Sequence, residues 1–168
     1  MKYRLLAIVV FAMGLQSAAA GEAVRYQLKE DTKLFGFLPG HTGGNAEFVI
    51  PFDKSYNELT AEQQSVLRGA YAEMGVSDEP PFPVGGLKTI YEPITEGQQR
   101  LMVSGTFRAD VEIDAEGNPI ALAVYRSPNK AVTKFVSSVV LLTKFKPAIC
   151  GGSPCKMGFP IRIGFTTR

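Results

Sequence analysis

The strongest constraint on the fold is the regular alternation of apolar and polar residues that begins at Gly105. A period of two is typical of a β-strand with one buried face. The sequence "DAEGN" follows this strand, and within it Gly117 can take a positive φ. Residues 120–125 then return as a partner strand, so the pattern predicts a β-hairpin. The apolar positions of its first strand are Phe107, Ala109, Val111 and Ile113.

A helix and one more strand are predicted after the hairpin. Ser127 and Pro128 fit the cap and first position of a helix, apolar residues recur at helical spacing over 131–140, and Pro147 closes it. A final alternating segment, "FPIRIGF", predicts a strand with one buried face. The expected fold class is therefore α+β, with a small antiparallel sheet of the hairpin and C-terminal strand covered by a helix.

The upstream part of the chain has weaker signals. Residues 21–79 are expected to form an N-terminal extension with one amphipathic helix, capped by Thr60 with Gln63 in a capping box and stopped by Gly75. The sequence "SDEPPFPVGG" predicts an extended arm or linker. "LKTIYEPI" fits a short helix or a strand, and Pro93 limits either. The main domain is predicted over residues 80–168.

Residues 1–20 have the pattern of a secretory signal. Lys2 and Arg4 precede an apolar run that ends in small residues, which predicts cleavage after Ala20. The alternative, an uncleaved membrane anchor, needs about 20 apolar residues, and this run is shorter. We therefore expect a periplasmic protein with no stable membrane insertion after cleavage.

The two cysteines, Cys150 and Cys155, flank a Gly-Gly-Ser-Pro turn. Cysteines of an exported protein meet an oxidising compartment, where pairing is the default. Zinc needs four ligands, and a redox dithiol normally has two intervening residues rather than four. We expect a structural disulfide that pins this turn just before the last strand.

The order of these landmarks resembles the C-terminal domain of TonB-type energy transducers. The landmarks here are Gly105, "FRADVEIDAEGNPIALAVYRS", the helix after Pro128, "FKPA", a Gly-Gly turn and "FPIRIGF", and "PPFPVGGL" resembles the entry segment of some members. The resemblance covers residues 80–168. A transducer also needs a retained inner-membrane helix and a long Pro-rich spacer, whereas here the leading segment is predicted to be removed and the Pro-rich stretch is ten residues long.

The resemblance implies a freestanding module that binds proteins, linked to TonB-dependent outer-membrane transport. Its family mode is strand addition, in which an extended peptide pairs with a sheet edge. The expected partner is a segment of an outer-membrane receptor or another envelope protein. The alternative is a structural or envelope protein that has lost peptide binding. The candidate edge is the last strand, with Phe159, Ile161, Arg162, Ile163 and Phe165.

Charge favours an acidic partner at that edge. Residues 101–168 carry 4 acids and 9 bases, and no acid follows Glu116. The protein's own acidic residues, Asp78 and Glu79, are the alternative occupant. A basic solvated face without a partner is also consistent with this charge, and no nucleic-acid binding is expected.

The sequence contains little that is typical of catalysis. The one histidine, His41, lies in a glycine-rich loop without a matched nucleophile, and "GHTGG" lacks the ending of a phosphate loop. Asp110 and Glu112 share one strand face with Arg108, which is typical of a solvated surface. We expect no enzyme activity, no catalytic residues, no cofactor and no metal.

Overall fold

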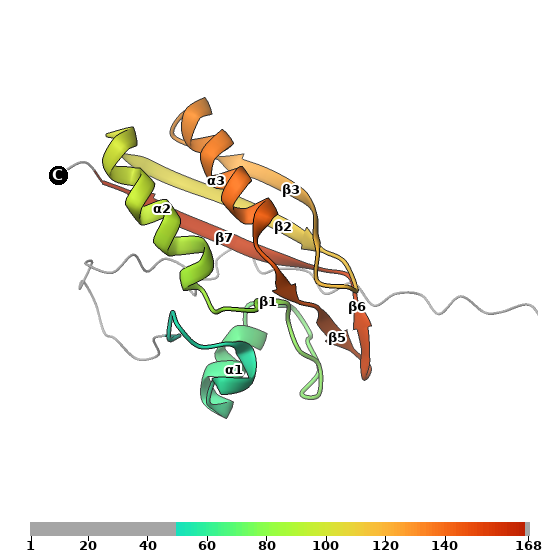
Figure 1. Ribbon diagram of the computed structural model, residues 1–168. Coiled ribbons are helices and arrows are strands. Elements are labelled where there is room, and N and C mark those ends of the chain that lie inside the picture. Colours follow the sequence, from blue (N-terminus) through green and yellow to red (C-terminus); the bar gives the residue numbers. More distant parts are fainter. Residues whose placement is uncertain (1–49, 167–168) are drawn as a thin grey trace, which may run out of the picture.

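The computed structural model describes residues 50–166, which form an α+β fold of helices and small antiparallel sheets (Figure 1). The predicted signal segment, His41 and Arg168 lie outside the described residues. No helix in residues 50–166 is long and apolar enough to cross a membrane. The elements, in chain order, are the 3-10 helix η2 (Tyr56–Glu58), α1 (Ala61–Arg68), β1 (Phe82–Pro83), α2 (Lys88–Leu101), β2 (Gly105–Ile113), β3 (Pro119–Arg126), α3 (Lys130–Leu142), β4 (Phe145–Lys146), β5 (Ala148–Cys150), β6 (Ser153–Cys155) and β7 (Met157–Phe165).

The main sheet has three antiparallel strands in the order β3-β2-β7. The pairing of β2 with β7 is unbroken from Gly105 opposite Phe165 to Ile113 opposite Met157. The apolar side chains of the alternating pattern lie on one face and are buried, which confirms the hairpin and the last strand. Gly117 has φ +81°, as the turn prediction requires.

Two helices cover the apolar face of this sheet, where the sequence predicted one. Helices α2 and α3 lie next to each other across β2, β3 and β7 (Figure 1). Helix α3 buries Val132, Val136 and Val140, which recur every four residues. These helices and the sheet therefore enclose the main apolar core.

Helix α3 begins two residues later than predicted. Asn129 is the N-cap, and its Oδ1 accepts a hydrogen bond of 2.9 Å from the N–H of Val132. The hydroxyl of Ser127 instead donates to the carbonyl of Asn129. Asparagine is as good a cap as serine, so the local geometry places Pro128 before the helix rather than in it.

Helix α2 resolves the ambiguity of "LKTIYEPI", because 14 residues form one helix through Pro93. A proline inside a helix removes one N–H and normally costs about 3 kcal/mol. The helix persists because Ile90, Tyr91 and Ile94 bury one of its faces in the core. Tertiary packing therefore overrides the local preference.

Helix α1 has the predicted capping box but ends earlier than predicted. The Thr60 hydroxyl accepts from the N–H of Gln63 at 3.3 Å, and the Gln63 side chain accepts from the N–H of Thr60 at 2.9 Å. The helix stops at Arg68 and not at Gly75, so the predicted stop is wrong. Two backbone hydrogen bonds between residues three positions apart follow, one of them from the Tyr71 N–H to the Arg68 carbonyl. This tighter turn places Ala70 and Tyr71 in the core.

The cysteines join β5 and β6 into a small hairpin. Cys150 and Cys155 form a disulfide with Cα atoms 5.8 Å apart. The turn between them holds Gly151 and Gly152, both with positive φ. The disulfide therefore lies where the sequence predicted it, at the turn before β7.

The arm that contains Asp78 and Glu79 is attached to the β5–β6 hairpin and not to β7. The buried carboxylate of Asp78 accepts a 2.8 Å hydrogen bond from the N–H of Gly151. Glu79 forms a β-bridge with Ile149 of β5, and its carboxylate pairs with Lys146 at 2.7 Å. The alternative in which these two residues cover β7 is therefore wrong.

Replacing Cys150 and Cys155 together with serine should lower the free energy of unfolding by about 2 kcal/mol and leave the fold intact. The bond closes a short loop, and this figure is the chain-entropy cost of that loop in the unfolded state. Urea denaturation followed by circular dichroism measures the difference. Fully reduced wild-type protein is the matched control, and it should lose the same amount. Free thiols in freshly isolated, folded protein would contradict the pairing.

Candidate binding sites

The sheet has two edges, and the register shows which backbone groups face outward. Pro160 has no N–H and lies opposite Asp110, so this pair is not one of the hydrogen-bonded pairs of the ladder. The hydroxyl of Tyr71 donates to the carbonyl of Gly158 at 2.9 Å, which agrees with that alternation. The outward groups of β7 thus belong to Gly158, Pro160, Arg162 and Gly164.

The five residues predicted for the binding edge therefore divide into two sets. The side chains of Phe159, Ile161, Ile163 and Phe165 are buried in the core, and their backbone groups face β2. Arg162 alone has its backbone groups on the outer side. The strand is at a sheet edge, as the sequence suggested, but only one of the five residues presents hydrogen-bonding groups there.

Side chains of the protein border the outer side of β7. Tyr71 binds the Gly158 carbonyl at one end, and the Gln98 amide donates to the Thr166 carbonyl at 2.7 Å at the other. Between them, burial raises the pKa of Tyr91, and the nearby backbone N–H and guanidinium of Arg162 partly oppose that shift. Burial also raises the pKa of Tyr71, so both hydroxyls are neutral. An incoming strand would have to displace these contacts.

The opposite edge, β3, is not covered by any part of the chain that the structure describes. The alternation that turns Ala121 and Ala123 toward β2 turns the N–H and C=O groups of Leu122 and Val124 outward. No residue between 50 and 166 forms a hydrogen bond with that outer side. This edge was missed because the sequence of β3 looks like an ordinary second hairpin strand. The sequence does contain one usable signal, because residues 120–124 are all apolar instead of alternating with polar residues. In the structure most of these five residues are exposed.

The two ends of β3 differ in charge, and the pairing with β2 is irregular at both of them. Register shifts on both sides leave residues 121–124 as the regular segment. Arg126 is the last residue of the strand and Lys130 follows it, whereas Asp114 and Glu116 precede it. On the face of the sheet that the helices do not cover, the Tyr125 ring lies 6.0 Å from the Arg108 guanidinium. The negative charge of Asp110 raises the pKa of the Tyr125 hydroxyl, which donates to that carboxylate.

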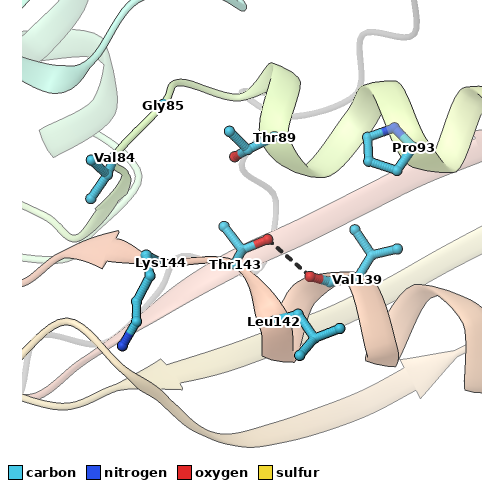
Figure 2. A pocket seen from close by; sticks show the side chains of 8 residues that line it. All are labelled: Val84, Gly85, Thr89, Pro93, Val139, Leu142, Thr143 and Lys144. Atoms are coloured by element: carbon cyan, nitrogen blue, oxygen red, sulfur yellow. Dashed lines mark hydrogen bonds between the residues drawn. The ribbon is translucent and has the colours of Figure 1, made fainter.

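An apolar groove of about 440 Å³ lies between the start of α2 and the end of α3 (Figure 2). We call it the α2–α3 groove. The sequence could not reveal it, because its two walls lie about 50 positions apart in the chain. Its lining residues are Val84, Gly85, Thr89, Pro93, Val139, Leu142, Thr143 and Lys144.

The residues considered for catalysis or metal binding are engaged in surface pairs. Glu112 pairs with Lys156, and Asp110 accepts a hydrogen bond from Tyr125. Burial raises the pKa of Asp110, and this hydrogen bond and the nearby arginines oppose the shift. The described part of the chain has no group of three His, Cys, Asp or Glu residues that could hold a metal ion.

Comparison of the chain with protein-family models, with curated proteins and with solved structures finds no match. The resemblance to TonB-type domains therefore rests on the sequence landmarks alone.

Proposed function

We propose that this chain is an exported, periplasmic module that binds an extended protein segment by strand addition, linked to TonB-dependent outer-membrane transport. The single observation that carries the proposal is the open outer side of β3, where the backbone groups of Leu122 and Val124 have no hydrogen-bond partner among residues 50–166. Unpaired groups in a row are a template for another strand.

The charges near β3 suit an acidic segment. Arg126 and Lys130 lie at its C-terminal end, and α3 has Lys134 and no acid. An extended segment with acidic residues at the matching end would be attracted and set in one direction. Partners with basic residues there would be disfavoured.

Strand β7 is a second candidate, favoured by its regular nine-residue pairing and by Arg162. However, the side chains of Tyr71 and Gln98 already bind the Gly158 and Thr166 carbonyls on its outer side, and a partner strand would have to compete with them. The alternative from another class is a structural envelope protein in which neither edge binds a partner.

Val124→Pro should reduce capture of the partner at least tenfold, because it removes an outward N–H from the open edge. Val124→Ala is the matched control, because it shortens the same exposed side chain and keeps the N–H. The measurement is a pull-down from periplasmic extract with the tagged mature chain, followed by titration of the captured segment.

A third variant tests the other edge. Gly164→Pro removes an outward N–H from β7, where the residue is exposed and has no atoms near its missing side chain. It should leave capture unchanged if β3 is the site. Equal capture by both Val124 variants would exclude β3, and loss with Gly164→Pro alone would assign the site to β7. Circular dichroism checks that each variant is folded.

A further inference from the structure

The hydrogen-bonding pattern of the β3 edge is complementary to itself. Strand β3 forms one edge of the main sheet (Figure 1), and its outward backbone groups belong to Leu122 and Val124, on either side of Ala123. When a second copy of β3 lies antiparallel to the first, with a two-fold axis at Ala123, Leu122 of each copy faces Val124 of the other. Each outward N–H of these residues then meets a carbonyl oxygen.

The apolar side chains along this edge also match a second copy. Leu122 and Val124 lie opposite buried residues of β2, so their side chains point to the side of the sheet that the helices cover. Val124 is 38% exposed, and Leu122 is half-buried. Pairing two copies places Leu122 of each beside Val124 of the other and removes apolar surface from water.

A small residue occupies the position of the two-fold axis. Ala123 lies opposite Asp110, on the other side of the sheet, and it is exposed. In the paired arrangement the two Ala123 residues form a non-hydrogen-bonded pair, in which the Cα atoms are about 4.5 Å apart. Two methyl groups are small enough for this close spacing.

The charges at the ends of β3 favour a second copy over a foreign acidic segment. Asp114 and Glu116 precede the strand. Hydrogen bonds from Asn118 hold the pKa of Asp114 below its usual range, so this carboxylate is negative at neutral pH. Arg126 ends the strand, and Lys130 follows it. Antiparallel pairing places the basic end of each strand beside the acidic end of the other, whereas a foreign acidic segment complements the basic end alone.

We propose that two copies of this chain form a dimer by antiparallel pairing of their β3 strands around Ala123, and that this dimer shields the edge until a partner segment displaces one copy. The dimer needs only the β3 edge, whereas its shielding role rests on the proposed function. An interface of two short strands is much smaller than that of a permanent dimer, so association is weak and reversible. A segment that binds the edge more tightly therefore competes by mass action.

Sedimentation equilibrium of the full mature chain measures this association. Between about 1 μM and about 1 mM, the weight-average mass should rise toward twice that of the monomer. Amide NMR spectra over the same range should show shifts at Leu122 and Val124, and none at Gly164 on the outer side of β7. A constant monomeric mass, or spectra in which Leu122 and Val124 do not change, would overturn the proposal.

Ala123→Lys places two ammonium groups beside each other at the two-fold axis and should raise the Kd of the dimer at least about tenfold. Within its own sheet this lysine lies opposite Asp110, so the fold is kept. Ala121→Lys is the matched control, because it adds the same charge to the same exposed face, opposite Glu112 and away from the axis. Equal weakening by the two variants would contradict the proposed axis.

An exchange of charges tests the direction of pairing. Glu116 and Lys130 lie seven positions before and after Ala123, so the antiparallel arrangement brings Glu116 of one copy toward Lys130 of the other. Both residues are exposed, and Glu116→Lys and Lys130→Glu should each weaken the dimer. The double variant should restore it. A double variant that is no tighter than either single one would overturn the antiparallel arrangement.

Ala123→Lys also separates this inference from the proposed function. It keeps the outward backbone groups, so at concentrations where the wild type is dimeric it should capture more partner in a pull-down from periplasmic extract. Equal capture by the two proteins would contradict the shielding role. A dimer without capture would refute strand addition to a foreign segment alone, and capture by a wild type that stays monomeric would refute the dimer alone.

Discussion

Replacing Gly117 with alanine is expected to destabilise the protein by about 3–5 kcal/mol. Two costs add at this position. The residue has φ +81°, which an alanine adopts poorly, and an added Cβ would lie 2.0 Å from the backbone carbonyl oxygen of Phe145. That oxygen belongs to β4, whose Phe145 N–H also donates to the Gly117 carbonyl at 3.0 Å, so the hairpin turn and β4 cannot move apart freely.

Gly152→Ala is the matched control for this change. Gly152 has φ +83°, but nothing lies within 4 Å of its added Cβ, so it isolates the cost of the backbone conformation at about 1–2 kcal/mol. Urea denaturation of both variants gives the comparison. Equal losses would show that the contact with β4 contributes nothing and that only the backbone angle matters.

Phe159→Ala should cost about 3–5 kcal/mol, the usual range for removing a large ring from a core. The side chain is 1% exposed, and its ring lies edge-on to Phe82 at 6.3 Å and to Phe145 at 5.5 Å. These rings come from β7, β1 and β4, so the loss affects three strands together.

Phe159→Leu is the conservative comparison. It keeps an apolar side chain in the same place and should cost less than half as much. Thermal and urea denaturation of the two variants measure the difference. Similar losses would mean that the ring contacts, rather than the filled volume, provide most of the stabilisation at this site.

The main sheet could be predicted from the sequence because its signal is local. Each of Phe107, Ala109, Val111 and Ile113 follows the last by two positions, and one buried face is enough to produce that pattern. The Thr60 cap was predictable for the same reason, since all its atoms come from four consecutive residues.

Features that depend on distant packing were not predictable. Pro93 is a poor residue for a helix interior, and only the burial of its neighbours against the sheet makes α2 continue. Asp78 binds Gly151, a residue 73 positions away, and no local pattern indicates that contact. The same limit applies to the α2–α3 groove, which exists only when both helices are in place.

The identity of the backbone groups that face outward from β7 was partly predictable from the sequence. Pro160 is part of the printed pattern "FPIRIGF", and a proline in a paired strand must turn its missing N–H outward. That rule alone would have moved the candidate groups from Ile161 and Ile163 to Arg162 and Gly164. Predicting which groups of β3 face outward requires the register of the hairpin, and the sequence does not specify that register.

The position of the disulfide also bears on the order in which the chain folds. Cys150 and Cys155 are five positions apart, so even a fully extended chain keeps them within about 18 Å. Oxidation can therefore precede the sheet, whose central pairing joins Gly105 to Phe165, 60 positions away. A turn already closed by the disulfide would then present the Gly151 N–H to Asp78 before the strands of the main sheet have paired.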